Sequence, residues 1–402
     1  MHGRVGDQGG RLTVHSDDNQ ALFQCFRRFE QRQAEWQTSL SAQLAGMRRE
    51  MLDAVSNPRK ASTADIAPTL LEAQRMGALL IPRENILSSL RYPEMRNRWD
   101  TITKANPSTY EWMFDAKGQD LPPLKFSQWL SREDGIFWIT GKAGSGKSTL
   151  VKHISEDLRT RTALEKWARG RELCIASHYF WFLGSPMEKL YEGLLRSILY
   201  EVLVKTQELI PTVCHTRWSD EMSGRDTAVM AWSSTELLQS VAHLAEQNVR
   251  NRGREACFCF FIDGLDEYDG DHRRVTATLL ELTKSTHIKI CASSRPWNVF
   301  HDAFETSKSQ GKWMELHLFT KGDIATVVNQ EIGHVLARRF SDAEDWQQLV
   351  AEVVEKSQGV FLWVALVIRK ELLPCLENRE DLNFLRKRLK TVPSGSALHL
   401  AF

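Results

Sequence analysis

Short apolar runs alternate with helical patterns through the middle of the chain. Apolar runs bounded by turn residues predict buried strands, whereas apolar positions spaced three and four residues apart predict helices. Strands that alternate with helices are typical of an α/β sheet. The strands predicted in this way are 135–140, 173–182, 257–263, 288–293 and a shorter 315–318.

Two serines mark predicted helix starts between these strands. Ser185 and Ser233 are each followed three residues later by a Glu, and Pro186 takes the first helical position after the first of them. These are the features of capping boxes. The helix after Ser233 is expected to run to about Val249, and the pattern beyond Thr320 is helical.

The N-terminal region has a different pattern. Residues 1–18 are polar and Gly-rich, so we predict that they are disordered. Residues 19–55 carry an apolar heptad seam that three polar residues interrupt. An amphipathic helix packed on a bundle and a self-associating coiled coil both fit this seam. Prolines and small polar residues make 56–85 a linker with a short helix.

Composition narrows the class of protein. Of the 402 residues, 26% are charged and 42% hydrophobic, an ordinary globular mixture. The formal net charge of +1 gives no basic field for nucleic acid. No apolar run approaches the roughly 20 residues that a bilayer requires. Seven scattered cysteines without zinc spacing fit a reducing compartment. We expect a soluble cytoplasmic protein with no membrane span and no nucleic-acid partner.

The octapeptide from Gly141 to Ser148 matches the phosphate-loop pattern GxxxxGK[ST] between a predicted strand and a predicted helix. Glycines let successive backbone N–H groups surround phosphate oxygens, and the helix adds its positive end. Lys147 would reach the β- and γ-phosphates, and the Ser148 hydroxyl would ligate Mg²⁺. The candidate nucleotide-binding residues are Gly141, Lys142, Ala143, Gly144, Ser145, Gly146, Lys147, Ser148 and Thr149.

A second motif, FCFFIDGLDE, ends the apolar strand 257–263. Asp263 at the strand tip would hold Mg²⁺ opposite Ser148, so these two are the candidate metal ligands. Asp266 and Glu267 follow three and four residues later. One of the two would polarise the attacking water, which makes both candidate catalytic residues.

Arg295 follows the strand 288–293 in the sequence IKICASSRP. A guanidinium matches phosphate oxygens in geometry, so Arg295 is a candidate catalytic residue that reads the γ-phosphate. An arginine on a surface turn is the alternative.

Together these motifs resemble the fungal NACHT-type P-loop NTPases of the signal-transducing STAND class, which have a nephrocystin-type N-terminal P-loop domain. A small residue after the metal aspartate, with acids at +3 and +4, sets that group apart from most P-loop ATPases. The resemblance covers roughly residues 85–375. The matching segments are ILSSLRYPEM (86–95), TYEWMF (109–114), GIFWITGKAGSGKSTL (135–150), FIDGLDE (261–267), SRPW (294–297) and GVFLWV (359–364).

The resemblance implies an α/β fold with a parallel P-loop NTPase sheet, in which strand 288–293 lies between strands 136–140 and 257–263. Helical regions would flank the sheet at both ends of the chain. The pattern of residues divides the N-terminal part into a disordered segment 1–18 and a helical segment and linker 19–85. The resemblance adds a connector 86–134, a NACHT P-loop NTPase domain 135–300 and a helical region 301–402 truncated before a winged helix.

The resemblance also implies a switch that holds ADP when closed and ATP, with Mg²⁺, when open and homo-oligomeric. Effector and sensor proteins would be its partners, in fungal self/non-self or immune-type signalling. Two function classes stay open: a slow ATPase or GTPase that signals, and a nucleotide-stabilised scaffold without significant turnover. A kinase or a nucleic-acid motor fits less well, because a motor would use basic grooves.

Overall fold

The computed structural model describes residues 79–114, 125–246, 249–251, 253–305, 312–340 and 343–398. The predictions for residues 1–18 and for the long helix 19–55 lie outside these residues. The chain divides into two compact units, Met1–Glu84 and Asn85–Phe402. The second unit contains every candidate site residue, and the description that follows concerns that unit.

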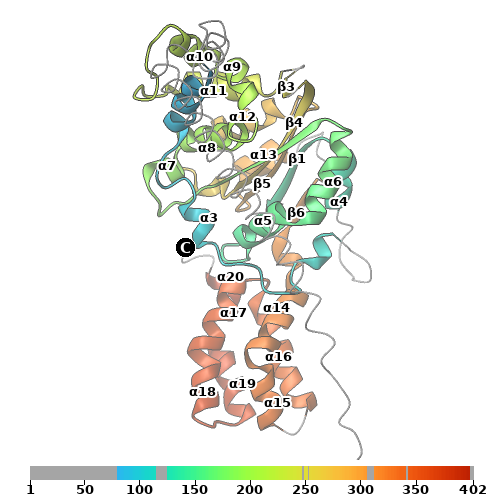
Figure 1. Cartoon of the computed structure of the whole chain (residues 1–402). Coiled ribbons are helices and arrows are strands. Elements are labelled where there is room, and N and C mark those ends of the chain that lie inside the picture. The colour runs from blue at the N-terminus through green and yellow to red at the C-terminus, as the bar shows by residue number, and fades with distance from the viewer. Residues whose placement is uncertain are drawn as a thin grey trace, which may run out of the picture. The chain divides into compact units, whose positions relative to one another are not determined.

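A mixed α/β architecture with a central parallel sheet organises this unit (Figure 1). The strand order is β2-β4-β5-β1-β6, all neighbours being parallel, and the short β3 pairs antiparallel with β4. The predicted position of β5 between β1 and β4 is therefore confirmed. The strands are β1 (Gly135–Thr140), β2 (Glu172–Tyr179), β3 (Arg250–Asn251), β4 (Arg254–Asp263), β5 (Ile288–Ser294) and β6 (Trp313–Glu315).

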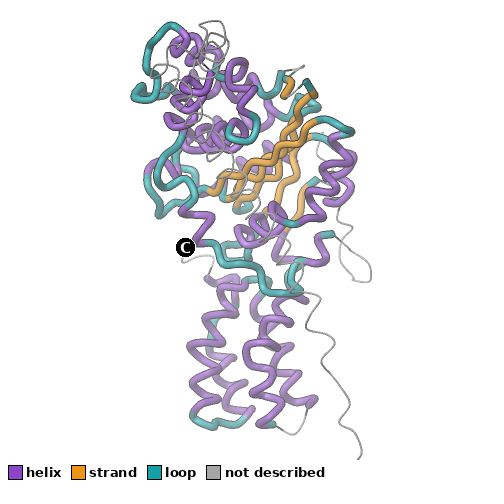
Figure 2. The backbone as a smooth tube through the Cα atoms, in the orientation of Figure 1, coloured by secondary structure: helices purple, strands orange, loops and turns teal. Residues whose placement is uncertain are grey.

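Side chains on the sheet alternate between two apolar layers, as the two-residue period of a strand requires. In β4, Phe258 and Phe260 belong to one layer, and Cys259 and Phe261 to the other. Helices cover both faces, so the central strands are apolar on both sides (Figure 2). The first layer packs against α8 (Tyr191–Leu203), α9 (Ile210–Val213), α11 (Ser234–His243), α12 (His272–Leu282) and α13 (Asn298–Phe304), and the second against α4 (Phe126–Arg132), α5 (Lys147–Glu156) and α6 (Leu158–Ala168).

The connector before β1 is part of the same core. Ile86 and Leu90 are buried in the first apolar layer, and Trp112 and Phe126 in the second. The connector also contains the short helix α3 (Asn97–Thr101). Aliphatic residues thus anchor the connector on one face of the sheet, and aromatic residues anchor it on the other.

Three predicted element boundaries differ from the structure. The strand predicted over 173–182 ends at Tyr179. The last strand covers Trp313–Glu315, and Leu316–Leu318 forms a 3₁₀ turn, because β6 pairs with β1 only as far as Thr140, where β1 itself ends.

The third difference concerns the helix after Ser233, which ends at His243 and not near Val249. Ser233 accepts a hydrogen bond from the Glu236 N–H at 3.1 Å, as a helix cap. The Glu236 carboxylate pairs instead with Arg217, at 2.7 Å. By contrast, Glu188 does accept the Ser185 N–H at 2.8 Å.

Beyond Thr320 the described residues form a helical bundle with its own core, which agrees with the predicted pattern. Ile324, Val353, Val364 and Leu385 are all fully buried in this core. The helices are α14 (Lys321–Val328), α15 (His334–Arg339), α16 (Ala343–Ser357), α17 (Phe361–Val367), α18 (Leu373–Glu377), α19 (Leu382–Thr391) and α20 (Gly395–Leu398), with short π segments at Asn329–Gly333 and Ile368–Leu372. Two further helices, α7 (Pro186–Lys189) and α10 (His215–Met222), precede β3.

None of the helices in the described part of the chain has both the length and the apolar character that a membrane crossing needs.

Candidate functional site

The predicted phosphate loop joins β1 to α5 at the carboxyl edge of the sheet. Two of its glycines have left-handed backbone conformations, with φ of +71° at Gly144 and +92° at Gly146. Residues with a Cβ rarely adopt this conformation, so the loop needs glycine at both positions. Gly146 also caps the N-terminus of α5, whose positive end therefore faces the loop.

Lys147 folds back over the loop that carries it. Its Nζ donates to the carbonyl oxygens of Gly141 at 2.8 Å and Lys142 at 3.0 Å. Burial lowers the pKa of Lys147, while the charges of Asp266 and Asp263 oppose that shift. The lysine predicted to bind phosphate thus lies within the electrostatic reach of two predicted carboxylates.

Asp263 is the last residue of β4, and its side chain is only 1% exposed. Its Oδ1 accepts a hydrogen bond from Ser293 Oγ, while its Oδ2 has no hydrogen-bond partner among the described residues. Burial raises the pKa of Asp263. The shift is opposed by the nearby Ser148 hydroxyl, which does not reach Oδ2 within hydrogen-bond distance, and by the hydrogen-bonded Ser293 hydroxyl. A buried carboxylate oxygen without a hydrogen-bond donor destabilises the fold unless a bound ligand or metal ion interacts with it.

Ser293 links the end of β5 to the end of the neighbouring strand β4. It belongs to β5, which lies beside β4, and its Oγ also accepts the N–H of Gly264 at 3.1 Å. Ser293 therefore fixes both Asp263 and the turn that follows it. The sequence analysis included Ser293 in the predicted strand but gave it no role.

Asp266 and Arg295 form an ion pair across this turn. Asp266 Oδ1 accepts the backbone N–H of Arg295 at 2.9 Å, and its Oδ2 lies 3.0 Å from Arg295 Nε. The Asp266 side chain is 5% exposed and that of Arg295 is 26% exposed. Both oxygens of Asp266 are therefore engaged by one residue at the end of β5.

Glu267 has looser contacts than Asp266. Its Oε2 accepts the backbone N–H of Phe182 at 3.0 Å, and its Oε1 lies 3.9 Å from Arg98 Nη2. Its side chain is 25% exposed, and burial raises its pKa. Of the two candidate carboxylates, Glu267 is thus the more accessible to water.

The residues at this edge fit Mg²⁺ bound together with a nucleotide. Mg²⁺ keeps most of its waters and takes one or two protein oxygens plus substrate phosphates. The orphaned Oδ2 of Asp263 and the hydroxyl of Ser148 are such oxygens. Among the described residues, no three His, Cys, Asp or Glu side chains are grouped so that they could hold a metal by themselves.

The outer side of the phosphate loop contacts the helical bundle. The Leu362 N–H at the start of α17 donates to Gly144 O at 3.1 Å. Lys142 Nζ donates to Gln358 O at 3.2 Å and to Ser396 Oγ at 2.8 Å. Lys142 thus points away from the carboxylates, so that only its backbone is available to a phosphate.

The connector is attached to the same bundle. Asp323 in α14 accepts the N–H of Tyr110 at 3.1 Å and the Nε1–H of Trp112 at 2.8 Å, both on Oδ2. Trp112 stacks on Phe319, with ring centroids 5.1 Å apart. Burial raises the pKa of Asp323 to about 6.

The structure therefore gathers Lys147, Asp263, Asp266, Glu267 and Arg295 at one edge, with Ser148 next to them. The sequence analysis did not identify Arg98. No motif marks it, because it is one of several arginines in an aromatic-rich connector far from the loop in sequence.

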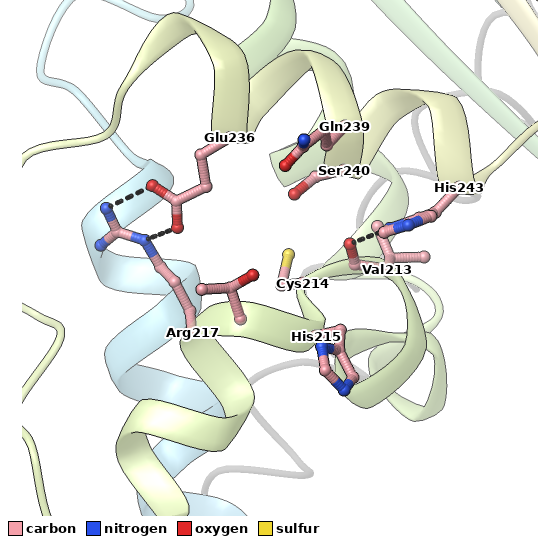
Figure 3. Close-up of a pocket in the computed structure, with 9 residues that line it drawn as sticks. Val213, Cys214, His215, Arg217, Glu236, Gln239, Ser240 and His243 are labelled. Atoms are coloured by element: carbon pink, nitrogen blue, oxygen red, sulfur yellow. Dashed lines mark hydrogen bonds and ion pairs between the residues drawn. The ribbon is translucent and has the colours of Figure 1, made fainter.

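A pocket elsewhere in the unit is too small for a nucleotide. It lies where α10 and α11 face each other and includes Cys214 and Ser240 (Figure 3). The Arg217–Glu236 ion pair contributes to its wall. Its volume of about 10 Å³ has room for a single water.

Comparison with known proteins gives one family match, to part of the chain. Comparison with curated proteins found no match. One solved structure, "Structure of Drosophila ORC bound to DNA", aligns at 14% identity with a TM-score of 0.29, covering 65% of this chain and 62% of that chain. This likeness is too distant to bear on function, and the chain spans less than two thirds of that protein's length.

Residues 108–295, just under half of the chain, match the family described as "Nephrocystin 3, N-terminal". This stretch contains the phosphate loop, the β4 carboxylates and Arg295. It is thus similar to a nephrocystin 3 N-terminal domain, and it carries the motifs of a nucleotide-binding P-loop NTPase.

Proposed function

We propose that this chain binds Mg²⁺–ATP at the loop 141–148, hydrolyses it slowly and acts as a nucleotide-dependent signalling switch. The observation that carries the proposal is the buried, unpartnered Oδ2 of Asp263 beside the lysine of a phosphate loop. The match to the nephrocystin 3 N-terminal family supports it.

In this proposal each residue has a distinct task. Lys147 leaves the loop carbonyls and binds the β- and γ-phosphates. Asp263 and Ser148 hold Mg²⁺, which neutralises phosphate charge when bound. Glu267 accepts a proton from the attacking water, and Asp266 orients Arg295 toward the phosphates.

Nucleotide binding is tested with Lys147→Ala. Removing a charge-assisted contact costs about 1.5–3 kcal/mol, so ATP affinity should fall about ten- to a hundredfold in calorimetric titration. Lys166→Ala on the exposed face of α6 removes a lysine without touching the site and should bind as wild type does. Equal affinity of the Lys147→Ala variant and wild type would remove Lys147 from the site.

Hydrolysis is tested with Glu267→Gln in single-turnover assays. Loss of a general base lowers rates about 10²–10⁴-fold, while ATP binding should be retained. Asp266→Asn should slow hydrolysis less, because it weakens only the pairing that orients Arg295. If wild type and both variants turn over equally, the catalytic assignment fails.

The second candidate function is a scaffold that nucleotide stabilises without significant turnover. The hydrogen bonds between the phosphate loop and the helical bundle, at Gly144 and Lys142, favour this function. A nucleotide that orders the loop would then also stabilise its contact with the bundle. Wild type that binds ATP but leaves it intact would support the scaffold.

The signalling part of the proposal rests on the resemblance to fungal NACHT-type switches. It includes a homo-oligomer in the ATP state, and effector or sensor partners for self/non-self or immune-type responses. Light scattering with ATP and with ADP tests the oligomer: equal mass in both states would contradict it.

A further inference from the structure

Arg98 brings a positive charge from the connector to the carboxylates of the candidate site. It lies in α3, about 40 residues before the phosphate loop in the printed sequence. Its Nη2 is 3.9 Å from Glu267 Oε1. Arg98 therefore lies beside the predicted base.

The guanidinium of Arg98 has donors that no described residue uses. Its Nε is buried and has no hydrogen-bond partner. The 3.9 Å approach to Glu267 is longer than a hydrogen bond, and the guanidinium lies 5.7 Å over the Trp181 ring. A guanidinium has five N–H donors in a fixed fork. The Arg98 side chain is thus packed in place, while its N–H groups lack hydrogen-bond acceptors among the described residues.

Arg295 differs in this respect. Its Nε is 3.0 Å from Asp266, and its backbone N–H donates to the same carboxylate. Reaching a phosphate with that Nε would require Arg295 to give up an ion pair. Arg98 would give up only a long contact with Glu267.

The place of a third phosphate follows from the chemistry of phosphate loops. The loop and its lysine hold the β- and γ-phosphates, and the residues of the loop and the neighbouring strand that would hold the metal lie beside the γ-phosphate. In this chain Asp263 ends β4 and Glu267 lies in the turn that follows, and Arg98 is 3.9 Å from Glu267. A phosphate carries the acceptors that a guanidinium fork matches.

We propose that Arg98 binds the terminal phosphate of a nucleoside triphosphate, so that the connector distinguishes triphosphate from diphosphate. This rests on the proposed nucleotide site. Because α3 lies between Leu90 and Tyr110, which are both anchored in the core, the contact would transmit the state of the nucleotide to the connector.

The test is calorimetric titration of the full chain with Mg²⁺–AMP-PNP and with Mg²⁺–ADP. Arg98→Gln keeps the length of the side chain and removes its charge. We expect affinity for AMP-PNP to fall about tenfold and affinity for ADP to stay unchanged, because only the triphosphate offers the contact. Arg96→Gln is the matched control: this neighbouring arginine is exposed, and both affinities should stay as in wild type.

The outcomes separate this inference from the proposed function. If wild type binds neither nucleotide, both the proposed function and the role of Arg98 are overturned. If Lys147→Ala weakens both nucleotides but Arg98→Gln weakens neither, or weakens both equally, only the role of Arg98 is overturned. If Arg98→Gln fails to fold, Arg98→Lys decides: it keeps the charge, so a preserved preference for AMP-PNP supports the role and a lost preference overturns it.

Discussion

The sheet edge and the helical bundle each contain a buried aspartate, and the two aspartates differ in one respect. Asp263 is 1% exposed and Asp323 is 5% exposed, and burial raises the pKa of both. In the bundle, Oδ2 of Asp323 accepts two N–H donors from the connector. At the sheet edge, Oδ2 of Asp263 accepts none.

This difference separates a structural carboxylate from a candidate ligand. Burial and a raised pKa accompany both residues, so neither property alone identifies a site. What distinguishes Asp263 is an acceptor that the fold leaves unused, next to a phosphate loop. The hydrogen bonds of Asp323 Oδ2 are all made within the protein, and they attach the connector to the bundle.

The largest expected effect comes from removing the bundle carboxylate. Asp323→Ala leaves the N–H of Tyr110 and the Nε1–H of Trp112 without an acceptor in a buried place. Each lost partner costs about 1–3 kcal/mol, so the free energy of unfolding should fall by about 3 kcal/mol in urea titration. Asp323→Asn retains an acceptor oxygen and should lose much less. Equal stability of the Ala variant and wild type would contradict the structural role.

A smaller effect is expected from pH. Because the folded-state pKa of Asp323 is raised from 3.8 to about 6, the folded state binds this proton more tightly than the unfolded state does. The proton's contribution to stability is therefore present at acid pH and lost as pH rises toward and through 6. Between pH 4.5 and 7.5 the loss is about 2 kcal/mol.

The measurement is the stability of wild type minus that of Asp323→Asn at each pH. The contributions of other titrating groups are common to the two proteins and cancel in the difference. A difference that does not change with pH would mean that Asp323 titrates as an exposed carboxylate does.

The sheet edge was largely predictable from the sequence, because its residues follow local rules. Gly141–Ser148 and Asp263–Glu267 each occupy a few consecutive positions at the end of an apolar strand. Carboxyl ends of neighbouring parallel strands meet at one edge, which brings these motifs together. The order of the strands, with 288–293 between the other two, was taken from the resemblance, and it agrees with the structure.

The contacts of the bundle were not predictable in this way. The bonds of Asp323 to Tyr110 and of Leu362 to Gly144 join residues more than 200 positions apart, and no spacing rule links such pairs. Arg98 was missed for the same reason. The stacking of Trp112 on Phe319 likewise joins residues more than 200 positions apart.

The smallest expected effect is that of Asp263→Asn. This variant distinguishes the two aspartates best, because it should keep or raise thermal stability while it lowers ATP affinity. Asp263→Asn removes a buried charge, keeps the acceptor for Ser293 Oγ and takes a carboxylate oxygen away from Mg²⁺. The nucleotide-free variant should therefore unfold at the same temperature as wild type or a higher one, because a neutral amide costs less to bury than a charge. Its Mg²⁺-dependent ATP affinity should fall about tenfold, or about 1.4 kcal/mol, because an amide is a poorer ligand for a hard cation. Asp323→Asn serves as the control and should leave this affinity unchanged. If Asp263→Asn instead lowers the unfolding temperature and leaves ATP binding intact, then Asp263 is a structural carboxylate of the same kind as Asp323.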